Sequence, residues 1–379
     1  MAYDSAYKLQ KTLETKVFNY AKDAKIAAEK ALKILVEIIT FYLLKTWEFN
    51  DNISIDYSLP EYGNPDITHK VDYALLPIIN EKIITIPKKI DFISPNFLLK
   101  ELQKNDFDIE KFDFTKNQLL SRTKILRNAC VIGHSTNSNL LAGFEKINEH
   151  TYDIRIYEQL LKPYAMIECK RVGVEEGMKK DPQTIQKAKQ GAYVPRAVSS
   201  LQKIKDENGE LKGIIYKSDN YYYIDDYSML HKKIIKSDDK ELLRKFVLTI
   251  GVVSNHGNWF TFNNPDKELK ILAQSYDWIL FLSDKGLAEF IEIFIQKPIE
   301  KYRIIRDAFS NSYAAVKKKN QFTKVQMNFE SDAILLDYFE NNLYLIEKWF
   351  NIISPANSNI DILKEQLVSL KNKPWNMIL

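Results

Sequence analysis

Two carboxylates and one lysine stand out as a group of residues that could do chemistry together. Residues 151–157 alternate apolar and polar side chains around Asp153, and residues 164–170 form a second short strand that ends near Glu168 and Lys170. Successive side chains of a strand point to opposite faces, so Glu168 and Lys170 share one face. The short, proline-containing connection suits an antiparallel hairpin, which would bring Asp153 beside that pair.

This trio predicts a divalent-metal site with an adjacent lysine. Mg²⁺ takes oxygen ligands and keeps several waters, and one or two carboxylates plus a substrate phosphate usually hold it. The backbone carbonyl of Cys169 could supply a further oxygen. Bound Mg²⁺ makes water a better nucleophile and stabilises charge on phosphorus, while Lys170 would orient the water or neutralise the developing charge. The expected reaction is hydrolysis of a phosphodiester.

The acid-x-lysine triplet alone is not specific, because it recurs at Glu14/Lys16 and Glu268/Lys270, among other places. The context of Glu168 and Lys170 separates them from the rest, since an apolar strand precedes them and a basic segment follows. The alternative is a strand end that carries a cross-strand ion pair and no metal.

Asp153, a gap of fourteen residues and then Glu168-x-Lys170 resemble the core of the PD-(D/E)xK nucleases, above all the type II restriction endonucleases. The resemblance covers residues 138–205. It implies an α/β fold with a restriction-endonuclease-like core, in which helices flank a mixed central sheet. It also implies Mg²⁺-dependent cleavage of double-stranded DNA at a specific sequence, leaving 5′-phosphate and 3′-hydroxyl ends.

The sequence departs from the family pattern at the first acid. Asp153 follows Tyr152 where the family has proline, whereas a literal Pro65-Asp66 lies far upstream. We interpret Pro65-Asp66 as a turn, and Asp66 and Asp72 are the substitutes for Asp153.

Members of this family often carry a further acid on the helix before the first core strand. Gly133–Asn139 is rich in helix-capping residues and predicts the start of a helix that bears Glu145 in that place. The resemblance implies a metal-site role for Glu145, and the alternative is a surface acid. Asn137 and Asn139 are candidates for DNA contact, because amide side chains bond phosphates and base edges.

The 379-residue chain has a net charge of only +4, yet its basic residues gather after the acid-x-lysine pair. Such a patch beside a metal site favours a polyanionic substrate and salt-sensitive binding. A helix over 182–190, ended by Gly191, presents part of the patch. The candidate phosphate contacts are Lys187, Lys189, Arg196 and Lys203. Arg122, Lys124 and Arg127 add cations near the site, and the alternative for these three is a solvated helix face.

Composition predicts a reducing, cytoplasmic compartment for the chain. It has two cysteines, which make no disulfide framework. The polar N-terminus is unlike a signal peptide, and the most apolar run, residues 31–44, contains charges and is too short to span a bilayer.

The chain divides into three predicted regions. Residues 1–115 are mainly helical with a strand and loop insert, residues 116–296 hold the nuclease core, and residues 297–379 are helical. A symmetric DNA site would call for a homodimer, and a cognate DNA methyltransferase would act on the same site without needing to bind this chain. The alternative functions are a repair or junction-resolving nuclease and a non-catalytic DNA-binding protein.

Overall fold

The computed structural model describes residues 5–90, 92–103, 109–121, 129–174, 179, 181–218, 221–257, 262–313, 321–327 and 329–379. The predicted cations Arg122, Lys124 and Arg127 lie outside these ranges. Across the part of the chain that is described, no helix combines the length and apolar character needed to cross a membrane.

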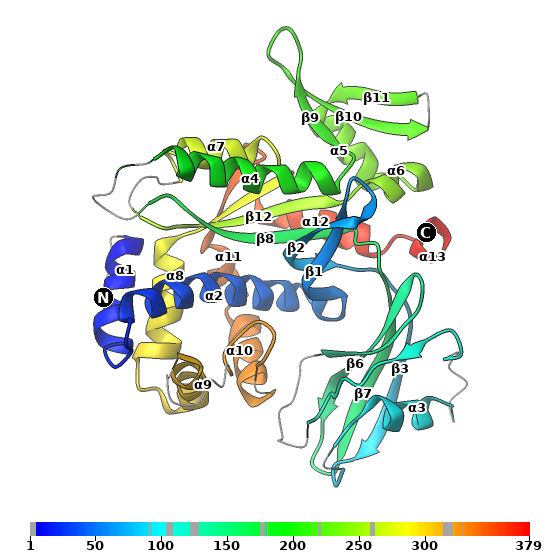
Figure 1. Cartoon of the computed structure of the whole chain (residues 1–379), viewed down its shortest axis with the longest axis vertical. Helices are drawn as coiled ribbons and strands as arrows, with labels where there is room; N and C mark the ends of the chain where they lie inside the picture. Colours follow the sequence, from blue (N-terminus) through cyan, green and yellow to red (C-terminus); the bar gives the residue numbers. More distant parts are fainter. Residues whose placement is uncertain are drawn as a thin grey trace.

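A six-stranded mixed sheet forms the centre of the molecule (Figure 1). Its strands, in spatial order, are β1 (Ile53–Glu61), β2 (Asn64–Leu75), β8 (Ala165–Val172), β12 (Leu248–Asn255), β13 (Trp278–Leu282) and β14 (Phe350–Ser354). β2 runs antiparallel to both of its neighbours, β1 and β8, whereas β8, β12 and β13 are parallel and β14 is antiparallel to β13. The predicted α/β class with a mixed central sheet is confirmed.

Helices cover both faces of this sheet (Figure 1). α2 (Ala24–Leu44) lies on one face, and α4 (Pro182–Val198) and α7 (Lys267–Ala273) lie on the other. Asp23 caps α2 by accepting the N–H of Ile26 at 3.0 Å. The second half of α2 is almost entirely buried, which places the charged residue Glu37 in the interior against the sheet.

The other helices pack around this frame. They are α1 (Ala6–Thr12), α3 (Pro95–Gln103), α5 (Tyr227–Lys236), α6 (Lys240–Lys245), α8 (Asp284–Ile291), α9 (Arg303–Tyr313), α10 (Phe329–Asn341), α11 (Leu343–Glu347), α12 (Ile360–Lys371) and α13 (Trp375–Ile378). Single turns of π or 3₁₀ helix occupy Leu13–Val17, Lys45–Phe49, Asn50–Asn52, Glu292–Gln296 and Glu300–Tyr302.

A second, five-stranded antiparallel sheet is inserted in the chain between β2 and β8. Its spatial order is β3 (Ile78–Pro87), β7 (Thr151–Leu160), β6 (Ser138–Ile147), β5 (Ala129–His134) and β4 (Asp113–Phe114). It has a hydrophobic core of its own, to which α3 contributes Leu98 and Leu102. Both sheets therefore draw strands from across the predicted boundary at residue 115, and β14 joins the central sheet from the region predicted to be helical.

The hairpin predicted between residues 151–157 and 164–170 is wrong. Both segments are strands, but β7 pairs with β3 and β6, whereas β8 pairs with β2 and β12. The proline-containing connection is a crossover from one sheet to the other. The alternating side chains of β7 explain this placement, since Ile154 and Ile156 are buried in the core of the second sheet.

The helix predicted to bear Glu145 is also wrong. Residues 138–147 form β6, and the segment Gly133–Asn139 contains the turn of the β5–β6 hairpin. Leu140 and Ala142 alternate into the core of the second sheet, which is a strand pattern that the capping residues obscured.

Two further predictions for the basic segment have mixed outcomes. The predicted break at Gly191 is absent, because α4 continues through Gly191 and Pro195 to Val198. The hairpin predicted around Asn208 and Gly209 is confirmed. It joins β9 (Gln202–Lys205) to β10 (Leu211–Ser218), and β11 (Tyr221–Asp226) completes a small third sheet.

Candidate active site

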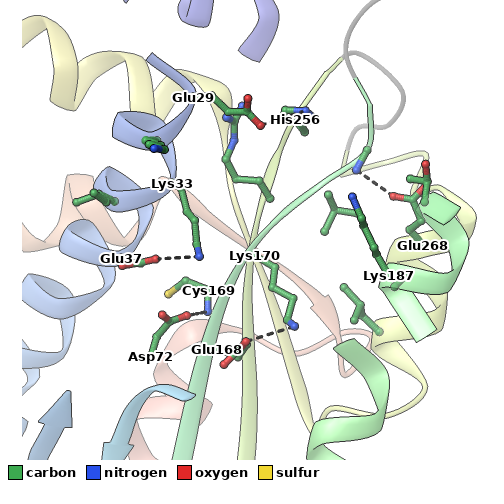
Figure 2. Close-up of a pocket in the computed structure, with 18 of the residues that line it drawn as sticks. Glu29, Lys33, Glu37, Asp72, Glu168, Cys169, Lys170, Lys187, His256 and Glu268 are labelled. Atoms are coloured by element: carbon green, nitrogen blue, oxygen red, sulfur yellow. Dashed lines mark hydrogen bonds and ion pairs between the residues drawn. The ribbon is translucent and has the colours of Figure 1, made fainter. Parts of the chain in front are cut away.

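Glu168 and Lys170 lie on β8, one of the inner strands of the central sheet (Figure 2). They point to the same side, as the strand periodicity predicts, and Lys170 Nζ lies 3.3 Å from Glu168 Oε1. Cys169 points to the opposite face, where its thiol lies 3.6 Å from the hydroxyl of Thr40 on α2. The predicted acid-lysine pair is therefore present and faces α4.

Asp72 on β2 supplies the second carboxylate of the site. The β2–β8 pairing has Tyr73 opposite Ile167 as its last pair, so Asp72 comes at the point where the ladder ends. Its Oδ2 accepts the backbone N–H of Cys169 at 2.7 Å and takes the place of a strand hydrogen bond (Figure 2). The alternative acid, Asp72, therefore lies beside Glu168, and Asp153 does not.

Asp153 and Glu145 both belong to the second sheet and are engaged there. Asp153 accepts hydrogen bonds from Thr85 at 2.7 Å and from Asn148 at 3.0 Å. Glu145 lies 2.8 Å from Arg155 in an ion pair. The structure does not bring either of them together with Glu168, because β7 and β6 share no sheet with β8. Asp153 and Glu145 therefore do not belong to the site that contains Glu168 and Lys170.

Three oxygens near Glu168 are the groups that could hold a small divalent cation. Glu168 Oε2 is buried and has no hydrogen-bond partner within the part of the chain that the structure describes. Asp72 Oδ2 accepts the Cys169 N–H, and Asp72 Oδ1, the other oxygen that could face a cation, accepts from Lys324 Nζ. A strand residue directs its N–H and C=O to the same side, so the Cys169 carbonyl also faces the gap between β2 and β8.

These groups suit magnesium better than a transition metal. Among the described residues, no three His, Cys, Asp or Glu side chains cluster as metal ligands. Mg²⁺ needs only one or two carboxylates, since waters and substrate phosphate fill its remaining positions. The residues that would hold it are Asp72, Glu168 and, through its carbonyl, Cys169.

Burial raises the pKa of two acids of the site, Glu168 and Glu37. Burial raises the pKa of the Glu168 carboxyl, and the nearby Lys170 partly offsets that shift. Burial likewise raises the pKa of Glu37, with the negative charge of Asp72 as a second cause. Carboxylates that water solvates poorly gain more from a nearby cation than exposed ones do.

A cleft of about 1240 Å³ opens over these residues, with α2 along one side and α4 along the other (Figure 2). Asp72, Glu168 and Lys170 line it together with Glu37. Several cations also line it, namely Lys30, Lys33, Lys70, Arg171, Lys179, Lys187 and Lys324. Further acids line it as well, namely Glu29, Asp56, Asp181 and Glu268, so positive and negative side chains are mixed over its surface. The cations among them could contact the phosphates of a ligand that reaches the carboxylates.

Gly191 lets α4 pass close over Lys170. A Cβ at this position would lie 3.0 Å from Lys170 Nζ and 3.3 Å from a methyl group of Leu272. Tyr276 donates its hydroxyl to the Gly191 carbonyl at 3.2 Å, which fixes the helix at this point. Gly191 therefore shapes the space around the lysine and does not end the helix.

The residues predicted to bind DNA lie in three places, which are α4, the β5–β6 hairpin and, for Lys203, β9. Lys187 lines the cleft, and Lys189 and Arg196 are exposed on α4. Asn137 and Asn139 lie at the β5–β6 hairpin of the second sheet, where Asn139 bonds His134 at 2.7 Å. Only the α4 cations therefore share an element with the wall of the cleft.

Lys203 is a structural cation, and its predicted role as a phosphate contact is wrong. Its ammonium group donates to the carbonyls of Ala273, at 3.2 Å, and Tyr276. It also lies 4.7 Å from the centre of the Tyr227 ring. Burial lowers the pKa of Lys203 to about 8, which is a shift that an exposed phosphate-binding lysine would not show.

This shift predicts a pH dependence of stability. Between about pH 8 and pH 10.5 the unfolded chain keeps a proton on Lys203 that the folded chain has lost, so the free energy of unfolding should gain a contribution that rises with pH in this window. Lys203→Met should lack that contribution. Urea unfolding of both proteins at pH 7.5 and pH 10 measures it, with Lys205→Met as the control. An equal pH response in the wild type and Lys203→Met would contradict the assignment.

We compared the chain with known protein families, curated proteins and solved structures. No family model, curated protein or solved structure matches this chain. The function must therefore be argued from the site itself.

Three residues of the site carried little sequence signal. Glu37 sits in an apolar helical run, and Lys324 lies far away in the C-terminal part of the chain. Glu268 was one of the unspecific acid-x-lysine matches, yet it is buried and accepts the N–H of Gly173 at 3.0 Å, just after β8. The one local sequence signal for this site was an acid, Glu37, within an apolar helical run, because acids are rarely buried without a partner.

Proposed function

We propose that this protein is a Mg²⁺-dependent endonuclease that hydrolyses phosphodiester bonds of double-stranded DNA, in the manner of a type II restriction enzyme. The observation that carries the proposal is the meeting of Asp72, Glu168 and Lys170 where the β2–β8 ladder ends, on the wall of a cleft with basic residues. Glu168 Oε1 pairs with Lys170, and the buried Oε2, which has no partner among the described residues, is the oxygen that a bound cation would take.

Each residue has a definite part in the proposed reaction. Asp72 and Glu168 would hold Mg²⁺, which when bound would activate water and stabilise charge on the phosphorus. Lys170 orients the attacking water or neutralises the negative charge that develops on the phosphate. Lys187 and the other cations of the cleft hold the DNA backbone across this centre.

Glu37 takes the place that the sequence resemblance gave to Glu145. The PD-(D/E)xK pattern puts a further acid on the helix before the first core strand, and α2 directly precedes β1 of the central sheet. Glu37 lines the cleft together with Asp72 and Glu168. A mixed central sheet with helices on both faces (Figure 1) is compatible with the restriction-endonuclease-like interpretation of the core.

The experiment that tests this function is digestion of phage DNA with Mg²⁺ or with EDTA, analysed on a gel. Discrete bands that need Mg²⁺ would support a sequence-specific endonuclease, and sequencing their ends would give the cut site and the 5′-phosphate. A Mg²⁺-dependent smear would instead indicate a less specific nuclease, such as a repair enzyme. Intact DNA under both conditions would contradict the nuclease proposal and favour a DNA-binding protein.

Gly191→Ala gives a prediction about the space around Lys170. The added methyl group would press on the ammonium group, so we expect cleavage to fall by about tenfold, which corresponds to ~1.4 kcal/mol in the barrier. The free energy of unfolding should change by no more than about 1 kcal/mol, because alanine is the better helix former. Initial cleavage rates and urea unfolding test this, with the exposed Gln186→Ala as the control. A Gly191→Ala protein that cuts at the wild-type rate would contradict the prediction.

A further inference from the structure

Lys324 reaches into the candidate site from a distant part of the chain. It lies in a short turn between Phe322 and Met327, which form a β-bridge and are both buried in the main core. Two hydrogen bonds close the turn. The Thr323 N–H donates to the Gln326 carbonyl, and the Gln326 N–H donates to the Thr323 hydroxyl. The turn is therefore anchored at both ends, and the Lys324 side chain is only 10% exposed.

Three carboxylates surround the Lys324 ammonium group. Its Nζ lies 2.5 Å from Asp72 Oδ1, 2.9 Å from Asp56 Oδ1 and 3.1 Å from Glu37 Oε2. These acids come from β2, β1 and α2, so one cation joins three elements of the core.

The strand register shows why a cation is needed here. Ile55 pairs with Tyr73 and Tyr57 pairs with Val71, so Asp56 stands opposite Asp72 across β1 and β2. Two like charges in this position destabilise a strand pair. Asp56 also has a φ of +52°, which is unfavourable for a residue other than glycine. The cation between the two acids offsets their repulsion.

Lys324 and a metal ion would need the same oxygen. Asp72 Oδ2 is committed to the Cys169 N–H, which leaves Oδ1 as the oxygen for a metal, and Oδ1 accepts from Lys324. Glu168 Oε2, by contrast, has no partner among the described residues. In the metal-free site, therefore, the Glu168 oxygen has no partner among the described residues, whereas the Asp72 oxygen accepts from the Lys324 ammonium group.

We propose that Lys324 is an internal competitor of the divalent cation, which occupies Asp72 Oδ1 in the metal-free protein and is displaced when the metal binds. This inference rests on the proposed function, because it concerns the same metal site. The competition by Lys324 makes the affinity for the metal weaker than the carboxylates alone would give. It also couples metal loading to movement of the Lys324 side chain away from Asp72.

Calorimetric titration of Mn²⁺ into the DNA-free protein tests the competition directly. Lys324→Met should bind Mn²⁺ at least tenfold more tightly than the wild type, because no ammonium group must be displaced. Lys187→Met, which changes another lysine of the same cleft, should leave the Mn²⁺ affinity unchanged. Equal or weaker Mn²⁺ binding by Lys324→Met would overturn the proposal. Absence of Mn²⁺ binding by every protein would overturn the metal site of the proposed function as well.

A second measurement uses the wild-type protein and does not depend on how the variant folds. Reductive methylation followed by mass spectrometry reports how accessible each lysine amine is. Labelling of Lys324 should increase several-fold when saturating Mn²⁺ is added, since the side chain is released from Asp72. If calorimetry shows Mn²⁺ binding while the labelling of Lys324 stays the same, the competition is wrong and the metal site stands.

Discussion

Asp72→Asn should abolish Mg²⁺-dependent DNA cleavage, lowering its rate by about 10³-fold or more. A bound metal contributes several kcal/mol to stabilisation of the transition state, and each 1.36 kcal/mol is a factor of ten. Asparagine has nearly the same shape and can still accept the Cys169 N–H through its amide oxygen, so the strand contact is kept. The variant therefore removes the charge at the metal site and keeps this strand contact, while Lys324 loses one of its three carboxylate partners and retains Asp56 and Glu37. Urea unfolding of the variant checks that the fold is kept.

Asp153→Asn is the matched control for that experiment. It makes the same chemical change in the second sheet, where Asp153 bonds only Thr85 and Asn148 among the interactions described. We expect it to cleave DNA at close to the wild-type rate. Cleavage rates of the two variants in Mg²⁺ decide between the two acids. If Asp153→Asn is inactive and Asp72→Asn is active, the site has been placed in the wrong sheet.

Lys170→Met should lower the cleavage rate by about 10²- to 10³-fold while leaving DNA binding largely intact. That range is typical for loss of one group that stabilises the charge developing in a transition state. Methionine fills most of the space of the lysine stem beneath Gly191, so packing against α4 is preserved. Single-turnover cleavage rates, together with DNA affinity measured in Ca²⁺, separate the chemical step from binding.

Lys187→Met is the contrasting variant, because it changes a cation on the cleft wall and not at the reacting phosphate. It should weaken DNA binding and lower the salt slope by about one, which is the effect of one lost phosphate contact. Saturating enzyme should restore its cleavage rate. A Lys170→Met protein that behaves in the same way as Lys187→Met would show that Lys170 only binds the backbone.

The sequence was sufficient to predict the local part of the site. Glu168 and Lys170 share a face of a strand, as their spacing requires, and the basic segment after them does form the helix beside the cleft. Strand periodicity also located β7 and β8 correctly. These features depend on residues within a few positions of one another, which is the range over which patterns in a sequence are informative.

The partner of Glu168 could not be predicted from local patterns. Neighbouring strands in a sequence usually pair, which favoured the hairpin between β7 and β8. The chain instead builds a complete second sheet between β2 and β8, so Asp72 bonds Cys169 across a separation of 97 residues. Lys324 reaches Asp72 across 252 residues. Only the tertiary structure reveals contacts at such a separation.

The central claim is that Asp72 and Glu168 together hold a divalent cation where the β2–β8 ladder ends. Anomalous diffraction from crystals of the wild-type protein soaked in Mn²⁺ tests it most directly. We predict one strong peak within ligand distance of Asp72 Oδ1 and Glu168 Oε2. A peak at Asp153 or Glu145, or no peak between Asp72 and Glu168 at saturating Mn²⁺, would contradict the account.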